Sequence, residues 1–508
     1  MNYAKIKKIH LHNFKKYEDD TIQCNPEFNI FVGDNGTGKS SVLQAIDLTL
    51  SGSITKVTGL GLENLFNINV INAWLKSPSL SSIPTLVIEL FFSELDDSIK
   101  SSYLFGEKFM NNDSKSSEYG IKLVCELNPD FCAEIDAKIS SGEMLSFPYD
   151  YYTIGFFTFA DHSYTKYLKP FYSVFIDNAS INATKMMQFV IENMYYTSTD
   201  DRERIALKQR FRDHIEKFVL PQAMDENGMF ISADIENFLD VKCNGVRLQN
   251  SGQGKINLCK TQSALLKNMH ESSVFMFEEP ENHLSYKNLH LLIELIKSLT
   301  SGRQIFIATH SSYITTRLGL RNAFFVNDEV CSLSDLSNET SRFFQKVPGD
   351  NLLQFVLSKK VILVEGAAEY ILIDKFARQV TNNSLSELGI WVIALNNLSF
   401  ARYLELAKFI GLKVAVVRDN DGKVKEWYPD YKSDNIKIFV ESDTTKTTFE
   451  ICLYSKNQAS LDILFADKKD VQEYMLKNKA EAAFSILEAD CDINVPEYIA
   501  EAIQWINS

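Results

Sequence analysis

The sequence contains no long uninterrupted apolar run, and this excludes the commonest kind of membrane anchor. No stretch approaches the roughly 20 apolar residues that a helix needs to cross a bilayer. The opening residues, MNYAKIKKIHLHNF, also have no apolar core of the kind that a secretory signal requires. From these two absences we expect a cytoplasmic protein.

Cysteine is present without any pattern. The eight cysteines include no C-x-x-C pair and no group with histidine at the spacing of a zinc site. Scattered thiols of this kind indicate reduced residues in a reducing compartment rather than disulfides or structural zinc. A fixed-period repeat and a long heptad run are absent as well.

Positive charge is in the minority: 52 lysines and arginines face 66 aspartates and glutamates, for a net charge of −14. This balance argues against a protein that coats nucleic acid by bulk charge, although it leaves room for a local basic groove. The hydrophobic content of 45% and the charged content of 23% are those of an ordinary globular chain. With 508 residues, the chain is long enough for two or more domains.

Strand and helix patterns alternate in the first part of the chain. A basic alternating stretch at 4–17 and an apolar stretch at 28–33 predict strands, and 39–52 predicts a helix. An alternating apolar run follows at 85–92. The order of strand, helix and strand then returns at 273–279, 286–299 and 304–310. This alternation indicates βαβ units and a mainly parallel sheet.

A highly charged helical pattern covers 184–218. In it, Arg204, Lys208 and Arg212 stand four residues apart and would share one face of a helix. Such a basic stripe is compatible with phosphate contacts, but charge runs more often form a solvated face or a dimerisation arm. We therefore expect a helical insertion at about 165–245.

The periodic pattern weakens between 327 and 357, and we place a domain boundary there. A second alternation follows, with strands at 360–366, 390–395 and 413–419 and helices at 368–379 and 400–411. The chain is therefore predicted to be an α/β protein of two domains, 1–345 and 346–508.

A phosphate-binding loop is the most specific motif of the first domain. GDNGTGKS, at 33–40, fits G-x-x-x-x-G-K-[ST] and lies between a predicted strand and a predicted helix, as the motif requires. Its backbone N–H groups can wrap phosphates, Lys39 can reach the β and γ phosphates, and the Ser40 hydroxyl can bind Mg²⁺. An ordinary glycine turn is the alternative. The predicted ATP-binding residues are Asn35, Gly36, Thr37, Gly38, Lys39, Ser40 and Ser41.

Two glutamates end the strand predicted at 273–279. In a P-loop ATPase an acid on a neighbouring strand holds the Mg²⁺ of the nucleotide, and Glu278 takes that place, where aspartate is commoner. Glu279 is then placed to orient or deprotonate the attacking water. Adjacent acids alone are weak evidence, but their position after a buried strand supports an ATPase.

The stretch VAVVRDNDGK, at 414–423, sets an apolar run against two aspartates. In an extended chain, Asp419 and Asp421 point to the same side and repel each other unless a cation lies between them. Mg²⁺ or Mn²⁺ would satisfy them, because hard cations prefer carboxylate oxygens. An Asx-rich turn explains the same residues without a metal.

Two glutamates of the same domain extend this acid set. Glu365 ends the strand predicted at 360–366, and Glu369 follows one helical turn later, so both can face the carboxyl edge of a parallel sheet. Asp419 and Asp421 leave the corresponding edge two strands later. Open α/β sheets place their binding sites at this edge.

The segments FEEPENHL and IFIATHSSYI resemble the Walker B, D-loop and switch-histidine regions of ABC-type ATPases of the RecF, SMC and OLD (overcoming lysogenization defect) kind. The likeness implies that His310 senses the γ-phosphate, with a capping or core histidine as the alternative. LQNSGQGK, at 248–255, resembles the ABC signature, through Ser251 and Gly252. It departs from the usual pattern in one of two ways. Either Asn250 replaces the phosphate-contacting serine, or Ser251 takes that role and the glycines are shifted. A signature implies a head-to-head homodimer, since it completes the partner's ATP site.

A glutamate followed two strands later by an aspartate pair resembles the Toprim fold of topoisomerases, primases and OLD nucleases. A Toprim domain behind an ABC-type ATPase resembles the OLD family in particular, over nearly the whole chain. By this likeness, 1–345 is an ABC-type P-loop ATPase domain and 346–508 is a Toprim domain with a Rossmann-like parallel sheet. It also implies that Glu450 is a metal ligand and that Lys479 lies near the scissile phosphate, although either could be ordinary solvated surface.

The expected metal ligands are Ser40, Glu278, Glu365, Glu369, Asp419, Asp421 and Glu450. The expected catalytic residues are Glu279, His310, Glu365, Asp419, Asp421 and Lys479. The cofactors would be ATP and Mg²⁺ or Mn²⁺. The resemblance thus implies an ATP-regulated, metal-dependent DNA endonuclease in bacterial defence against phage, acting as a homodimer or with a companion protein.

Other functions of Toprim proteins fit the sequence less well. A topoisomerase would need a tyrosine nucleophile on a separate DNA-gate domain, and none can be assigned. Primase activity would require recognition elements that the sequence does not show. The alternative that stays open is an ATP-switched scaffold of the RecF or SMC kind, in which the Toprim acids are structural and a partner does the chemistry.

Overall fold

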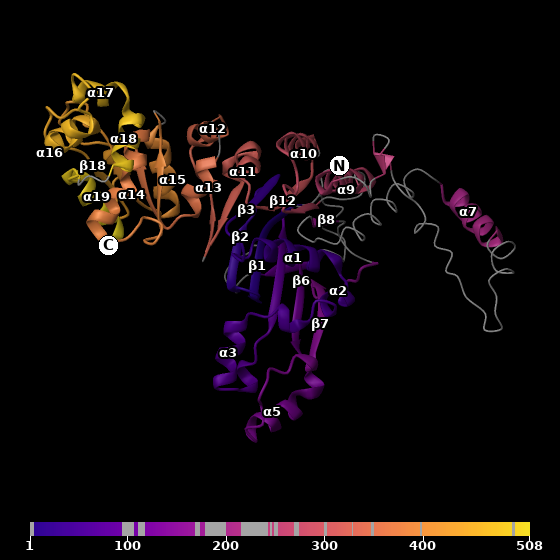
Figure 1. The fold of residues 1–508 in the computed structure, drawn as a ribbon. Coiled ribbons are helices and arrows are strands. Elements are labelled where there is room, and N and C mark those ends of the chain that lie inside the picture. The colour runs from indigo at the N-terminus through magenta and orange to yellow at the C-terminus, as the bar shows by residue number, and fades with distance from the viewer. Residues whose placement is uncertain are drawn as a thin grey trace, which may run out of the picture. The chain divides into compact units, whose positions relative to one another are not determined.

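The structure is a computed structural model of the chain. It describes residues 5–93, 106–109, 117–167, 173–177, 200–214, 242–243, 246–247, 252–268, 274–298, 302–327, 329–346, 350–396, 399–489 and 493–508. The chain divides into two compact units (Figure 1). The first unit is Met1–His310 with Asn322–Ser332, and the second is Ser311–Arg321 with Leu333–Ser508. Residues 333–345, which the sequence pattern assigned to the first domain, thus group with the second unit. Most of the predicted insertion at about 165–245 lies outside the described residues.

A six-stranded sheet is the centre of the first unit. Its order is β14 (Val330–Ser332), β13 (Ala323–Val326), β3 (Phe28–Val32), β12 (Gln304–Thr309), β11 (Val274–Glu278) and β8 (Ser173–Asp177). All neighbours are parallel except β13 and β14, so the predicted mainly parallel sheet is confirmed. The carboxyl ends of β3, β11 and β12 therefore meet at one edge.

The first unit also contains a second sheet, which is antiparallel. Its order is β2 (Tyr17–Gln23), β1 (Ile6–Phe14), β4 (Leu86–Phe92), β6 (Ser117–Leu127) and β5 (Gly106–Phe109), with β7 (Tyr152–Thr158) also paired to β6. The strand predicted over 4–17 ends at Phe14, because Asn13 and Lys15 have φ of 54° and 51° and turn the chain into β2.

Helix α1 (Lys39–Ser51) lies between these two sheets. Ten of its 13 residues are buried, and it contacts strands of both sheets. The side chain of Gln304 on β12 joins the sheets as well, since it hydrogen-bonds both the N–H (2.8 Å) and the carbonyl (2.7 Å) of Ile6 on β1. Burial on both sides fixes the N-terminus of α1, where Lys39 stands.

The remaining helices of the first unit are α2 (Ile54–Thr58), α3 (Ile68–Lys76), α5 (Cys132–Ser140), α7 (Asp201–His214), α9 (Gln253–Asn268) and α10 (Tyr286–Ser298), and β9 (Lys242–Cys243) pairs with β10 (Val246–Arg247). Helix α7 is the described part of the charged pattern predicted at 184–218. Arg204 and Lys208 on it are half-buried. The side chain of Arg212 lies outside those described.

The second unit is built on a parallel sheet of four strands. Its order is β16 (Ile390–Ala394), β15 (Lys360–Val364), β17 (Lys413–Val417) and β18 (Ile436–Phe439). Its helices are α11 (Ser312–Leu318), α12 (Asn338–Lys346), α13 (Asp350–Leu357), α14 (Ala367–Thr381), α15 (Phe400–Ile410), α16 (Phe449–Leu464), α17 (Val471–Lys477), α18 (Lys479–Glu488) and α19 (Glu497–Asn507). This is the alternation that the sequence predicted for the domain.

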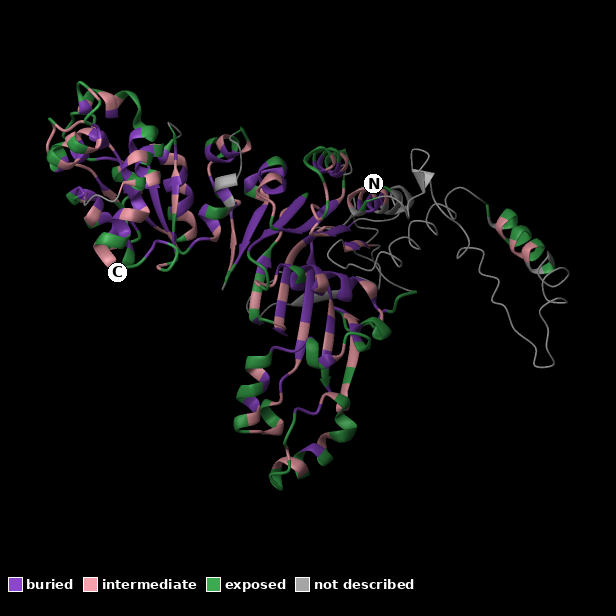
Figure 2. Cartoon of the chain, in the orientation of Figure 1, coloured by how far each residue is buried: buried purple, intermediate pink, exposed green. Residues whose placement is uncertain are grey.

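Helices cover both faces of this sheet. Helices α14 and α19 contact the strands and each other, while α13 and α15 also contact the strands. After their first residues, β15 and β17 are buried throughout. Figure 2 draws the buried residues of the chain in purple. The fold is the predicted Rossmann-like α/β arrangement. Within the described ranges, no helix is both long and apolar enough to span a bilayer.

Candidate functional site

The phosphate-binding loop joins β3 to α1, as the motif requires. Gly36 and Gly38 have φ of 79° and 100°, a region in which other residues are strained. A Cβ on Gly38 would also lie 2.6 Å from Cε of Lys16. Asn35 is exposed at the loop tip, and Thr37 Oγ1 donates to the carbonyl of Asp34 (2.8 Å). The loop thus has the backbone shape that phosphate cradling needs.

Lys39 points into this loop. Its Nζ donates to the carbonyls of Gly33 (2.8 Å) and Asp34 (2.7 Å), and the residue is only 4% exposed. Burial lowers the pKa of Lys39, while nearby carboxylates, with Glu279 first, oppose that shift. The ammonium group of Lys39 therefore lies within the curve of the phosphate-binding loop. Ser41, two residues after Lys39 in α1, is also buried.

Two glutamates lie at the carboxyl end of β11, beside the loop. Glu278 hydrogen-bonds the Ser40 side chain, and burial is the main reason that its pKa is raised. Glu279 has a φ of 44°, and its N–H donates to the carbonyl of Ala308 on β12 (2.8 Å). This places the predicted metal-binding hydroxyl and acid together, and it turns the second acid away from the strand.

His310 follows β12 and faces the same acids. Its Nδ1 lies 3.7 Å from Oε1 of Glu279 and 3.6 Å from Oε1 of Glu281. The same Glu281 oxygen accepts hydrogen bonds from Thr309 Oγ1 (2.6 Å) and from the His310 N–H (3.0 Å). Sequence reasoning missed Glu281, although its place in EEPEN was visible. It fixes the backbone on which His310 stands.

The predicted signature segment is described only in part. Asn250 and Ser251 lie outside the described residues, whereas Gly252 is exposed immediately before α9, and a Cβ added to it would meet no atom within 4 Å. Asn257 on α9 donates to the carbonyl of Asn282 (3.0 Å), and the Asn282 amide donates to Oε2 of Glu279 (2.6 Å). The start of α9 is thereby connected to the acids at the end of β11.

A second group of acids lies at the carboxyl edge of the sheet in the second unit. Glu365 follows β15, and its Oε2 accepts the N–H of Asp419 after β17 (3.2 Å). Asp419 Oδ1 in turn accepts the N–H of Phe449 at the start of α16 (2.8 Å). Glu369, in the first turn of α14, is 5% exposed. The stretch from β15 into α14 and the end of β17 thus bring these carboxylates to the same edge of the sheet.

The pKa values of two acids in this group reflect their burial and the neighbouring carboxylates. Burial, followed by the charges of Glu369, Glu365 and Glu450, raises the pKa of Asp419 to about 7. Burial and the charges of Glu450 and Glu365 likewise raise the pKa of Glu369 to about 7. Carboxyls with such pKa values lack a sufficient positive counter-charge.

Glu450 and Lys479 join this group. Glu450 is 2% exposed in the first turn of α16, and its Oε2 accepts from Lys479 Nζ at 2.9 Å. Burial opposes ionisation of Lys479, but the bond to Glu450 and the charges of Asp419 and Glu369 outweigh it and raise the pKa of the lysine. The two residues matched most loosely by sequence therefore lie with the other acids.

Asp421 differs from the expected geometry. The chain is not extended there: Asp421 has a φ of 51°, and Asn420 Oδ1 accepts the N–H of Gly422 (2.9 Å) in an Asx-type turn. The premise that Asp419 and Asp421 share one side of an extended strand is therefore wrong. Asp421 is half exposed, and its Oδ2 accepts from Nη2 of Arg418 at 3.0 Å. The Asx-rich turn that was the alternative reading is therefore present, and Asp419 in the same stretch still belongs to the acid group.

The acid group of the second unit offers the type of donor atom that a hard divalent cation prefers. Glu365, Glu369, Asp419 and Glu450 offer carboxylate oxygens alone, the donors that Mg²⁺ and Mn²⁺ prefer. Burial and the neighbouring carboxylates raise the pKa values of Glu369 and Asp419, and a bound cation would counter that effect. Across the described residues, however, no three His, Cys, Asp or Glu side chains form a ready-made metal cage. A cation would therefore have to draw these side chains closer.

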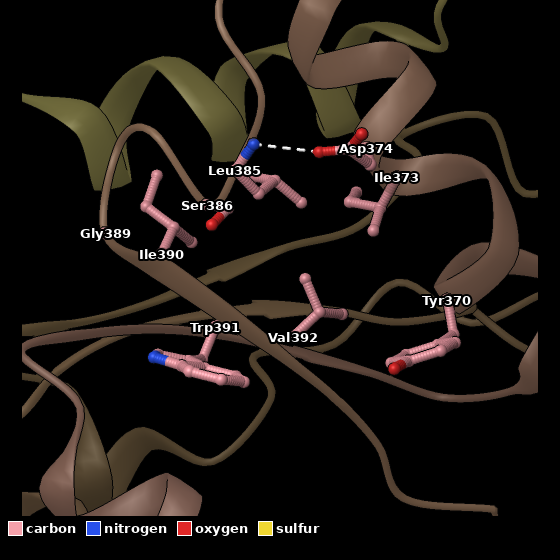
Figure 3. Close-up of a pocket in the computed structure, with 9 residues that line it drawn as sticks. All are labelled: Tyr370, Ile373, Asp374, Leu385, Ser386, Gly389, Ile390, Trp391 and Val392. Carbon is pink, nitrogen blue, oxygen red and sulfur yellow. Dashed lines mark hydrogen bonds between the residues drawn. The ribbon is translucent and has the colours of Figure 1, made fainter.

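A cavity of about 380 Å³ lies elsewhere in the second unit, between α14 and β16 (Figure 3). Tyr370, Trp391 and Val392 line it, and Asp374 closes one side by accepting the N–H of Leu385 (2.8 Å). None of the predicted acids lines this cavity. Its position beside the edge strand separates it from the acid group at the carboxyl edge.

Comparison with known proteins identifies the parts of the chain. A family model described as overcoming lysogenization defect protein-like, TOPRIM domain, matches residues 356–421. A model of an AAA ATPase domain matches 5–242, and a model described as AAA domain, putative AbiEii toxin, type IV TA system, matches 244–316. The chain therefore carries ATPase domains followed by an OLD-like Toprim domain.

Short stretches of the chain are similar to RecF proteins. It is 31% identical to the DNA replication and repair protein RecF of Limosilactobacillus reuteri over 100 residues, which are 20% of this chain and 26% of RecF. It is 40% identical to RecF of Staphylococcus haemolyticus over 42 residues, 8% of this chain and 11% of that protein. The chain thus spans about a quarter or less of these relatives.

Two solved structures are similar at low identity. The SMC head domain from Thermotoga maritima has a TM-score of 0.30 and 14% identity, covering 64% of this chain and 97% of that one. The recombination mediator protein RecF with ATP has a TM-score of 0.34 and 12% identity, covering 65% and 100%. The domain models show ATPase domains followed by an OLD-like Toprim domain, which matches the ATPase–Toprim architecture of the OLD family.

Proposed function

We propose that the protein is an ATP-regulated, divalent-metal-dependent DNA endonuclease. The observation that carries the proposal is the group of carboxylates at the carboxyl edge of the second unit, formed by Glu365, Glu369, Asp419 and Glu450. Gathering like charges away from water costs free energy unless a cation compensates them. A catalytic metal site is the function that best repays this cost.

The acids and the lysine have separate roles in this proposal. Glu365, Glu369, Asp419 and Glu450 would hold Mg²⁺ or Mn²⁺, which when bound polarise a phosphodiester and activate water. Lys479 brings a positive charge to the same edge, where it suits the charge that develops on the phosphate. Asp421 stands at the exposed rim of the acid group, where an incoming DNA strand can reach it.

The first unit supplies the ATP-dependent control. Lys39 and the loop would bind the nucleotide phosphates, Ser40 and Glu278 its Mg²⁺, and Glu279 the attacking water. His310 lies beside Glu279 and would sense the γ-phosphate. Because Gly252 is exposed at the start of α9, a second copy could complete the site, and we include a homodimer in the proposal.

The wider setting is proposed from the family resemblance. A cytoplasmic enzyme would meet both ATP and DNA. A role in bacterial defence against phage, with or without a companion protein, extends the same proposal.

A second candidate function is an ATP-switched scaffold whose Toprim acids are structural. It is favoured by one observation: Lys479 and Arg418 already pair with Glu450 and Asp421. Paired acids need no metal. In that case a partner protein would cleave the nucleic acid.

A cleavage assay separates the two functions. Purified protein is incubated with supercoiled plasmid, linear DNA or RNA, with Mg²⁺ or Mn²⁺, and with or without ATP. The endonuclease proposal expects metal-dependent nicking or cutting of DNA that EDTA abolishes. A protein that hydrolyses ATP but cuts none of these substrates under any metal condition would support the scaffold instead.

A further inference from the structure

A buried arginine stands directly beside the acids of the second unit. Arg418 lies between β17 and Asp419, and its side chain is 8% exposed. Its Nη2 lies 3.0 Å from Oδ2 of Asp421 and 3.8 Å from Oε2 of Glu365. One guanidinium group therefore faces carboxylates that leave two neighbouring strands, β15 and β17.

The rest of the guanidinium is held just as firmly. Its Nε donates to the carbonyl of Asp419 (2.9 Å), and its Nη1 donates to the hydroxyl of Tyr428 (3.2 Å). Its Cζ lies 3.5 Å from the ring centroid of Trp427, a residue that is 9% exposed. The Lys425 ammonium lies 3.6 Å from the same ring. Each nitrogen of Arg418 thus has a partner, and the ring fixes its plane.

This arrangement uses properties that only arginine has. The guanidinium is planar and stays charged at every accessible pH, and it presents its N–H donors in a rigid fork. A lysine could supply the charge, but as a point charge on a flexible chain it could not serve the Asp421 carboxylate, the Asp419 carbonyl and Tyr428 together. The geometry therefore indicates orientation of the acids beyond mere neutralisation.

We propose that Arg418 is a positioning residue of the acid site, which orients Glu365 and the turn from Asp419 to Asp421 for a divalent cation and is itself oriented by Trp427. This inference rests on the proposed metal-dependent function. It adds a residue that touches neither substrate nor metal and acts through its contacts with the acids. Groups that orient metal ligands are commonly required for full metal affinity.

The test is a calorimetric titration of Mg²⁺ or Mn²⁺ into the chelator-treated full-length protein without nucleotide. The variant is Arg418→Lys, which keeps the charge and loses the fork. We expect its Kd for the metal to rise by about 10- to 100-fold. The matched control is Arg378→Lys, because Arg378 pairs with Asp374 at 3.0 Å on the exposed side of α14. The control should bind metal as the wild type does.

A second, milder variant protects the test against misfolding. Tyr428→Phe removes only the hydroxyl that accepts from Arg418, and we expect it to raise the Kd by about 2- to 10-fold. Thermal unfolding in EDTA checks both variants. Trp427 supplies an optical readout: Mg²⁺ should change the tryptophan emission of the wild type, and Trp427→Phe should lose that change.

Each outcome bears on the inference. Unchanged or tighter metal binding by folded Arg418→Lys and Tyr428→Phe overturns it, even if the wild type cleaves DNA. Weakened binding by the variants supports it, even if the wild type proves unable to cleave, which would sink the nuclease proposal alone. A wild type that binds no divalent cation overturns both.

Discussion

The backbone N–H of Phe449 donates a 2.8 Å hydrogen bond to Oδ1 of Asp419. Phe449 is the first residue of α16, and the next residue, Glu450, pairs with Lys479. Free N–H groups and partial positive charge at a helix N-terminus favour a carboxylate. This bond joins the acid after β17 to the acid and the lysine of the later helices, so a change at Asp419 should be felt by the whole group.

Lys39→Ala should abolish ATP hydrolysis, with a loss of at least about 100-fold in rate. The β and γ phosphates lose their charged partner, while the loop keeps its glycines. Steady-state phosphate release measures the effect, and Lys76→Ala, at the exposed end of α3, is the control. A folded Lys39→Ala protein with normal turnover would refute the role given to the loop.

Glu279→Gln should still bind ATP but hydrolyse it about 100-fold more slowly. The amide is nearly isosteric with the carboxylate and can keep the contact with Asn282, but it cannot act as a base. Equilibrium binding of labelled ATP and single-turnover hydrolysis separate the two steps. Loss of binding together with turnover would show that Glu279 has a different role.

Asp419→Asn should stabilise the metal-free protein at high pH only. The pKa of Asp419 is raised to about 7 from an ordinary value of 3.8, so between these values the folded protein binds more protons than the unfolded one. Stability therefore falls as the pH rises from about 4 to 7. The variant removes this penalty, and we expect a gain of about 1 to 2 kcal/mol at pH 8 and little gain at pH 4.5.

Thermal unfolding in EDTA at both pH values measures this difference. The amide oxygen of the asparagine can still accept the N–H of Phe449, so the helix contact is kept. An equal gain at both pH values would show that packing, and not charge, causes it.

ATP should promote a homodimer in which the start of α9 faces the partner's nucleotide. Sedimentation velocity with and without ATP measures the state. Gly252→Arg should block the dimer without unfolding the chain, since a Cβ there meets no atom within 4 Å. A wild type that stays monomeric at every concentration, with and without ATP, would contradict the expected dimer.

Local motifs and periodicity predicted the strands and helices that carry the candidate sites. The loop at 33–40 lies between β3 and α1, and Glu278 ends β11, because each motif carries its own strand and helix signals. The strand–helix alternation of the second unit is also confirmed, with β15 and β17 ending just before Glu365 and Asp419. Such features depend on neighbours in the sequence.

Residues whose roles depend on distant partners were harder to find. Arg418 and Glu281 look like ordinary charged residues until Trp427, Tyr428 and Thr309 are placed around them. The turn at Asp421 was underestimated, because a positive φ in a non-glycine residue leaves little trace in the sequence. Sequence patterns indicate which strand ends carry acids, and only the folded chain shows which basic side chains already pair with those acids.

The most direct test of the account is nuclease activity of Asp419→Ala alongside its ATPase activity, with Asp467→Ala as the control because Asp467 is an exposed aspartate paired with Lys468 in the same unit. If Asp419 helps to hold the catalytic cation, the variant should lose cleavage of DNA with Mg²⁺ or Mn²⁺ by at least about 100-fold while it keeps ATP hydrolysis near the wild-type rate. The control should retain both activities. A folded Asp419→Ala protein that still cuts DNA as the wild type does would contradict the central claim.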